Sequence, residues 1–343
     1  MKITTIGIDL AKNVLQIHGA DANGTPVLRK QLKRNEIMKY FANLEPCVVG
    51  MEACGSAHYW ARQLQSLGHD VKLISPQFVK PFVKTNKHDV ADAEAICEAV
   101  SRPTMRFVPI KNVEQQAMLS LHRAREGFVS DRTATANRIR GLMAEYGLVI
   151  PQGIGHVRSR VPELIEDATN ELPGMFRALI DRLLDHLKWL SQQIEAIETQ
   201  IKVWHKNNAD SQRLAEIPGI GPIIATALIA TIGNARNFKN GRELAAWIGL
   251  VPKQHSTGGK QTLLGISKRG DGYLRKLLIH GARSLTYYAG KRISPDSWLS
   301  KLMARRHINV AVVAQANKTA RTVWAILVHG REFRPDYALK AAA

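Results

Sequence analysis

Short apolar runs separated by turn signals dominate the first third of the chain. Runs of about four to eight residues, bounded by Gly, Asn or Pro, are typical of β-strands. Two helix-like stretches interrupt them, one near residues 35–44 and one from Ser56 to about Leu67. The expected strands are residues 3–10, 14–20, 26–32, 47–52 and 70–75. Three strands in a meander, followed by alternating helices and strands, are the order of a ribonuclease-H-like α/β domain.

This strand order brings four acidic residues toward one place. In such a domain the first strand lies beside the strand that follows the first helix, so Asp9 and Glu52 would be neighbours. Asp89 and Asp92 open a helix-like run and, three residues apart, share one face of it. Four carboxylates together would hold two divalent cations, which enzymes use on phosphodiester bonds. Each acid alone has a simpler explanation, since Asp89 could be an N-cap and Asp92 could favour the helix dipole. The four together favour a metal site.

The middle of the chain, residues 111–210, reads as mostly helical. Its apolar residues recur at alternating spacings of four and three, which is a heptad seam. This regularity favours the pairing of two helices in a coiled coil, possibly from two subunits. The alternative is a long helix packed inside its own chain. The seam consists of Phe176, Ile180, Leu183, Leu187, Leu190, Ile194, Ile197, Ile201 and Trp204.

The last region, residues 211–343, opens with a pattern similar to a helix-hairpin-helix. Two helical stretches flank the turn P218-G-I-G221. Gly219 and Gly221 would let the turn approach a phosphate, and the amides at the start of the second helix would point at it. An ordinary helical hairpin that uses glycine for its turn is the alternative. We therefore expect a mainly α C-terminal domain.

A basic, glycine-rich segment follows this hairpin. Ser256 and the adjacent Thr257 offer two hydroxyls in its middle, and His255 points away from Ser256 if the segment is extended. A serine hydroxyl is a poor nucleophile until a base or metal removes its proton, so a turn cap or phosphate ligand is the simpler reading. The candidate nucleic-acid contacts here are Lys253, Lys260, Lys268, Arg269, Arg275 and Lys276.

The charge distribution strengthens the nucleic-acid interpretation. The net charge is +19, and residues 234–343 hold 20 Lys and Arg against 5 Asp and Glu. An excess concentrated in one third of the chain is typical of a polyanion-binding surface. A basic face kept for solubility is the milder alternative.

Length and composition set the remaining bounds. A chain of 343 residues is long enough for two or three domains, and we expect boundaries near residues 110 and 210. No apolar run is long enough to span a bilayer, and the N-terminus lacks the pattern of a signal peptide. The three cysteines form no CxxC pair and indicate buried thiols in a reducing cytoplasm.

Five motifs resemble those of one family. They are G7-I-D-L-A-K-N13, G50-M-E-A-C-G55, K87-H-D-V-A-D-A-E-A-I96, the stretch from Gly249 to Lys260, and the stretch from Gly265 to Arg275. Together they resemble the DEDD-type insertion-sequence transposases, which pair a RuvC-like domain with a C-terminal domain that bears a serine. That family includes Piv-type DNA invertases and recombinases guided by a bridge RNA. The resemblance covers nearly the whole chain.

The resemblance implies a mechanism and a set of partners. Asp9, Glu52, Asp89 and Asp92 would bind Mg²⁺ or Mn²⁺ as the DEDD tetrad, and Ser256 would attack a phosphate to give a serine–DNA intermediate. Thr257 stays the alternative nucleophile. The metal would lower the pKa of the hydroxyl, and the carboxylates and the serine would meet across domains, even across subunits. Donor and target DNA, a guide RNA, a dimer or tetramer, and a nucleoid-associated place in the bacterial cytoplasm are also implied.

Two other functions are compatible with parts of the sequence. One is a nuclease of the Holliday-junction-resolvase type, which hydrolyses DNA with four carboxylates and water and uses Ser256 only as a phosphate ligand. The other is a non-catalytic nucleic-acid-binding scaffold, which the presence of all four acids disfavours.

Overall fold

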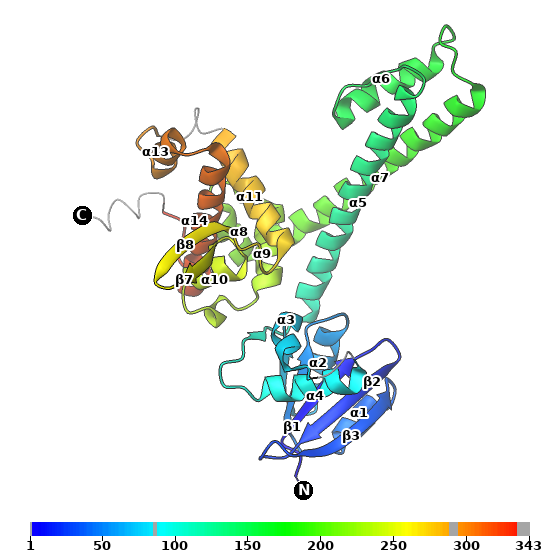
Figure 1. Ribbon diagram of the computed structural model, residues 1–343. Helices are drawn as coiled ribbons and strands as arrows, with labels where there is room; N and C mark the ends of the chain where they lie inside the picture. Colours follow the sequence, from blue (N-terminus) through cyan, green and yellow to red (C-terminus); the bar gives the residue numbers. More distant parts are fainter. Residues whose placement is uncertain (1, 85–87, 288–293, 335–343) are drawn as a thin grey trace. The chain divides into compact units, whose positions relative to one another are not determined.

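A computed structural model describes residues 2–84, 88–287 and 294–334 (Figure 1). Lys87, the first residue of the third motif, and the end of the last predicted region lie outside the described residues. The chain divides into two compact units, residues 1–114 and 115–343. Each unit has hydrophobic cores of its own. The division of the second unit at residue 210 stays a prediction.

The first unit is built on a six-stranded mixed sheet with the order β3-β2-β1-β4-β5-β6. All five predicted strands are confirmed, and β6 is an addition that its two-residue length hides in the sequence. The first strand pairs antiparallel with β2 and parallel with β4, as a ribonuclease-H-like order requires. The strands are β1 (Thr5–Leu10), β2 (Val14–Ala20), β3 (Pro26–Lys33), β4 (Val48–Glu52), β5 (Asp70–Ile74) and β6 (Phe107–Val108).

Helices cover both faces of this sheet. Ile6 and Ile8 of β1 pack with α1 (Ile37–Ala42) and α2 (Ala57–Ser66) in one core. The opposite face is covered by α4 (Asp89–Val100), which contacts β1, β2 and β4. The short helices α3 (Pro76–Val79) and η1 (Lys80–Phe82) lead toward α4. A mixed α/β first unit is therefore confirmed.

The second unit begins with long helices. The heptad seam lies on α7 (Gly174–Lys206), which packs beside α5 (Val113–Ala144) and α6 (Ile154–Glu166). Arg125 on α5 forms an ion pair of 2.6 Å with Glu198 on α7, and the rings of Phe128 and Trp189 lie 5.7 Å apart. Ile180 at the seam is fully buried in this packing. The helices of the chain itself thus cover much of the seam, as the alternative reading expected, and no second subunit is needed to bury it.

The rest of the second unit is mainly helical around a single large core. A two-stranded hairpin, β7 (Pro252–Thr257) with β8 (Lys260–Ile266), is added to the helices. The helices are α8 (Ala209–Ala215), α9 (Pro222–Ile232), η2 (Ala235–Asn237), α10 (Gly241–Trp247), α11 (Gly272–Tyr287), α13 (Trp298–Arg305) and α14 (Ile308–His329). Within the described residues, no helix is both long and apolar enough to cross a bilayer.

A buried polar contact joins α5 to this core. His122 on α5 is 1% exposed and bridges Tyr273 on α11 and Thr226 on α9, at 2.9 and 3.0 Å. The Thr226 hydroxyl donates to the carbonyl of Pro222, so it accepts from Nε2 of the histidine. Nδ1 then accepts from the Tyr273 hydroxyl. Burial lowers the pKa of His122 to about 4, so the imidazole is neutral at pH 7.

Candidate metal centre and nucleophile

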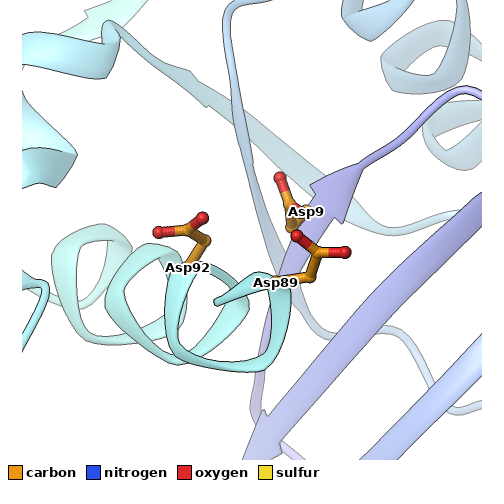
Figure 2. A group of neighbouring side chains, drawn as sticks. All are labelled: Asp9, Asp89 and Asp92. Atoms are coloured by element: carbon orange, nitrogen blue, oxygen red, sulfur yellow. The ribbon is translucent and has the colours of Figure 1, made fainter. Parts of the chain in front are cut away.

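Three of the four predicted carboxylates come together in the first unit. Asp9 lies near the end of β1, and Asp89 and Asp92 lie in the first turn of α4. One carboxylate oxygen from each lies within 4.8 Å of the other two. Figure 2 shows the Asp9 side chain near the end of β1, beside the side chains of Asp89 and Asp92 on the first turn of α4.

Two glycines bring α4 this close to the strands. A Cβ on Gly7 would lie 2.2 Å from the carbonyl oxygen of Ala93, and a Cβ on Gly50 would lie 2.9 Å from Val100. These two strand positions therefore face α4 and must be small. Alternation along a strand places Asp9, two residues after Gly7, on the same face. The close approach thus delivers the start of α4 to the end of β1.

Glu52, the fourth predicted ligand, ends the neighbouring strand. The register of β1 with β4 pairs Ile8 with Met51, and Asp9 and Glu52 are the next residues on each strand. Glu52 lies two residues after Gly50, so it is on the same face of the sheet as Asp9. Its carboxylate is not in the three-residue group. Cys54 is exposed, but partial loss of hydration at its sulfur raises the pKa of the thiol, and the negative charges of Glu52 and Asp9 raise it further.

The start of α4 is capped by a residue other than the aspartates. The N-cap is His88, whose Nδ1 accepts a hydrogen bond of 3.2 Å from the amide of Val90. The simpler reading of Asp89 as an N-cap is therefore wrong, because Asp89 is the first residue inside the helix. Neither carboxylate caps the helix, so both complement the helix dipole and stay candidate ligands for a cation.

The donor set fits a hard divalent cation. Carboxylate oxygens are the ligands that Mg²⁺ and Mn²⁺ prefer, and three converge here with a fourth on the adjacent strand. Cys54 is the nearby soft donor, and its raised pKa keeps the thiol protonated at pH 7. The first unit therefore carries a carboxylate group suited to Mg²⁺ or Mn²⁺.

Ser256 lies on the β7–β8 hairpin of the second unit. The turn at Gly258 and Gly259 has positive φ at both residues, 53° and 78°, as a two-residue hairpin of type I′ requires. All residues of β7 are exposed. The Ser256 Oγ accepts a hydrogen bond of 3.1 Å from the Gln254 side chain. Thr257, the alternative nucleophile, lies on the opposite face of the strand from Ser256.

The predicted nucleic-acid contacts fall into two groups. Lys253, Lys260, Lys268 and Arg269 are exposed on the hairpin and just after it. Arg275 instead donates to the carbonyls of Ile248 and Arg269, both at 2.9 Å, and Lys276 pairs with Glu126 on α5. The last two side chains thus have partners within their own chain.

The two glycines of the predicted helix-hairpin-helix differ in their surroundings. Gly219 has a φ of 88°, and its Cβ would lie 2.7 Å from the carbonyl oxygen of Gly281 on α11. Close packing of the chain on itself therefore explains this glycine. Gly221 is the N-cap of α9 and faces open space. Its place at a helix start keeps it a candidate phosphate contact.

Sequence reasoning missed two polar residues beside these groups. Arg34 follows a strand rich in exposed basic residues, and it looks like another solvated charge. Its Nη2 donates to the carbonyl of Ala11 and to the hydroxyl of Ser56, both at 3.2 Å. Gln254 could have been found, since strand alternation places it on the same face as Ser256.

Comparisons with known proteins identify the family. A family model of DEDD-type transposases matches residues 6–148, and one described as transposase IS116/IS110/IS902 family matches residues 211–295. A probable family 20 transposase of Pseudomonas aeruginosa is 50% identical over 98% of this chain and 100% of its own length. The transposase for insertion sequence element IS1328 of Yersinia enterocolitica is 44% identical over 96% of this chain and 98% of its own. The transposase for insertion sequence element IS1111A of Coxiella burnetii is 42% identical over 97% of this chain and 92% of its own length. Two family models match residues 6–148 and 211–295, and these relatives are similar over at least 92% of their own length, so the chain belongs to the IS116/IS110/IS902 family of transposases.

Proposed function

We propose that this protein cuts and rejoins DNA strands during transposition of an insertion sequence, through a covalent serine–DNA intermediate. The observation that carries the proposal is the convergence of Asp9, Asp89 and Asp92 within 4.8 Å in a chain of a transposase family. The exposed basic hairpin around Ser256 supports strand transfer over hydrolysis.

In this proposal the first unit holds the cation. Asp9, Asp89 and Asp92 would hold Mg²⁺ or Mn²⁺, and Glu52 would complete the ligand set from the adjacent strand end. A bound cation would supply Lewis-acid chemistry at a phosphate and would favour loss of a hydroxyl proton. The carboxylates also repel the DNA backbone when no cation is present, so DNA binding at this site depends on the metal.

Ser256 supplies the nucleophile. Its Oγ attacks a backbone phosphorus, an Oγ–P bond forms, and the P–O bond to one deoxyribose breaks. The proton of the hydroxyl passes to solvent, and the leaving oxygen takes up a proton to become a DNA hydroxyl. Attack by a DNA hydroxyl on the phosphoserine reverses the step, so rejoining needs no ATP. The exposed Lys253, Lys260, Lys268 and Arg269 hold the strand by its phosphates.

The family resemblance adds a guide RNA to donor and target DNA as a partner, and a dimer or tetramer as the active form. The basic charge of the second unit supports binding of a polyanion but is equally suited to RNA and DNA. Sequencing of RNA that co-purifies with the protein tests this part. A single abundant RNA from the flank of the element is the expected result, and random cellular RNA would count against a guide.

The test of the reaction uses DNA that carries the ends of the element, with Mg²⁺ and the co-purifying RNA. We expect strand cleavage together with a protein–DNA adduct that survives denaturation. Ser256→Ala abolishes the adduct and the cleavage, and Thr257→Val retains both. Asp89→Ala loses cleavage while binding DNA through the second unit.

Two outcomes would favour the other functions. Cleavage without an adduct, retained in Ser256→Ala, indicates a hydrolytic nuclease of the resolvase type, because the carboxylate group can activate water without a serine. Full transposition by Asp89→Ala in cells indicates a non-catalytic scaffold.

A further inference from the structure

Arg34 lies between the two chain segments that leave the carboxylate-bearing strand ends. Ala11 comes two residues after Asp9, and Ser56 comes four residues after Glu52. The Arg34 guanidinium donates to the backbone carbonyl of the first and to the hydroxyl of the second. Its position is thus tied to the same two strand ends that position the carboxylates.

The guanidinium is held in place but not neutralised. It lies over the ring of Trp60, with 5.9 Å from Cζ to the ring centroid, and Trp60 is 5% exposed. Among the described residues, no carboxylate forms an ion pair with it within 4.0 Å. The Nε atom of Arg34 is buried, and no group among the described residues forms a hydrogen bond with it. A buried, unpaired donor on a full positive charge is costly and uncommon in folded proteins.

The local backbone is also strained where Arg34 is anchored. Ser56 has a φ of 66°, which side chains other than glycine rarely adopt, and its hydroxyl makes no capping bond to α2. The hydroxyl accepts from Arg34 instead. Strain of this kind persists where the surroundings require it and is frequent at functional sites.

The two hydrogen bonds of Arg34 place it at the strand ends that bear the carboxylates. Its anchors are Ala11, on the segment that leaves β1 after Asp9, and Ser56, on the segment that leaves β4 after Glu52. Both hydrogen bonds of Arg34 use Nη2, which leaves Nη1 for a ligand.

We propose that Arg34 binds a DNA phosphate next to the carboxylate group. Nη1 donates to a phosphate oxygen in a charge-assisted hydrogen bond, and the bonds of Nη2 to Ala11 and Ser56 preorganise the guanidinium for this contact. Arg34 stabilises the negative charge that develops on the phosphate during strand cleavage. The inference rests on the proposed function of the first unit.

A purely structural role is the alternative, in which Arg34 only joins two loops. Arg62 provides a matched control, because it also donates to a backbone carbonyl, that of Lys111, at 2.5 Å. Arg62→Gln removes a structural arginine bond from the same unit. Arg34→Lys retains the charge but loses the planar group that bonds Ala11 and Ser56 through one nitrogen and offers another nitrogen to a ligand.

A readout separate from cleavage is the alkylation of Cys54. Cys47 and Cys97 are buried and Cys54 is exposed, so a thiol reagent modifies Cys54 in the folded chain. The ratio of alkylation rates with and without a DNA duplex carrying one end of the element measures occupancy beside Arg34. The ratio cancels differences in thiol reactivity between variants.

The experiment compares the full chain with Arg34→Gln, Arg34→Lys and Arg62→Gln. We expect Arg34→Gln to lower single-turnover cleavage at saturating DNA by about 100-fold, as loss of one donor to a developing oxyanion does elsewhere. We expect it also to remove the protection of Cys54, while the melting temperature falls no more than in Arg62→Gln. Arg34→Lys should recover part of both, and Arg62→Gln should leave cleavage and protection within about threefold of the parent.

Three results overturn the inference. One is wild-type cleavage by Arg34→Gln while Asp89→Ala is inactive, which leaves the proposed function intact. Another is loss of activity with Cys54 still protected by DNA. The third is a lowered melting temperature with no recovery in Arg34→Lys, which shows a structural role. Cleavage by Asp89→Ala would instead overturn the proposed function itself.

Discussion

Gly7 allows α4 to lie against β1 beside the carboxylate group. Backbone atoms of α4 occupy the space where a side chain at this position would lie, with the Ala93 oxygen at 2.2 Å and the Cys97 nitrogen at 2.4 Å. Backbone does not move aside as a flexible side chain does. The helix that bears Asp89 and Asp92 can approach Asp9 only because this residue has no Cβ.

Gly7→Ala therefore tests the link between packing and the metal site. We expect a loss of about 1 to 3 kcal/mol in the free energy of unfolding, as for other overpacked positions. We also expect weaker Mn²⁺ binding, because α4 must move away from β1. Chemical denaturation and a Mn²⁺ titration followed by electron paramagnetic resonance measure the two effects.

Gly55→Ala is the matched control, since nothing lies within 4 Å of its added Cβ. We expect its free energy of unfolding to stay within about 0.5 kcal/mol of the parent. Equal Mn²⁺ affinity in Gly7→Ala and the parent would contradict the packing argument.

His122 gives the second unit a dependence on pH with a definite sign. Its pKa in the folded chain is about 4, below the ordinary 6.5, so the unfolded chain binds its proton more readily. The stability that this histidine contributes is complete above pH 6.5. It falls as the pH drops from 6.5 toward 4, by about 3 kcal/mol in total.

Thermal unfolding of the full chain between pH 7 and pH 4 checks this expectation. His122→Gln removes the titration and should lose less stability over the same range than the parent. An identical pH dependence in both proteins would contradict the assignment of a buried neutral imidazole.

At the scale of elements, the heptad seam on α7 shows how a regular pattern can mislead about its partner. Residues such as Ile180 and Leu187 are buried by α5 and α6 of the same chain. A heptad pattern indicates that one side of a helix is buried. It does not indicate whether the covering helices come from the same chain or from another chain. The predicted helix is correct, and its covering element could not be read from spacing alone.

Ile180→Ala tests this intrachain packing. Ile180 is fully buried, so the substitution should lower the free energy of unfolding by about 2 to 5 kcal/mol. Leu179→Ala is its neighbour on the exposed side, at 44% exposure, and should cost less than about 1 kcal/mol. Equal losses in both variants, or a loss that depends on protein concentration in Ile180→Ala alone, would point to a second subunit on the seam.

The sequence predicted the sheet well because its strands are short, apolar and clearly bounded. Alternation and register then placed Asp9 and Glu52 side by side, and helical spacing placed Asp89 and Asp92 on one face. The contacts of Arg34 were beyond reach, because they depend on where two distant loops meet. Gly219 is a similar case, since its partner Gly281 lies in another helix.

At the scale of the whole molecule, we propose that the first unit binds the metal and the second unit carries the nucleophile. The proposed intermediate requires both units to act on one phosphate. Nothing in that chemistry demands that the two come from the same subunit.

Mixing two inactive variants tests whether subunits share sites. Asp9→Ala retains Ser256, and Ser256→Ala retains the carboxylates. If sites are shared between subunits, the mixture should recover a measurable fraction of the cleavage that neither variant has alone. Each variant mixed with itself is the control, and failure of every such mixture would count against sharing.

The most direct measurement is the identity of the residue that becomes linked to DNA. The adduct formed with Mg²⁺ is digested with nuclease and protease, and mass spectrometry locates the residual nucleotide on the peptide. We expect a phosphodiester on Ser256 in the wild-type chain and no linked peptide in Asp89→Ala. A nucleotide on Thr257, or cleaved DNA with no linked peptide, would contradict it.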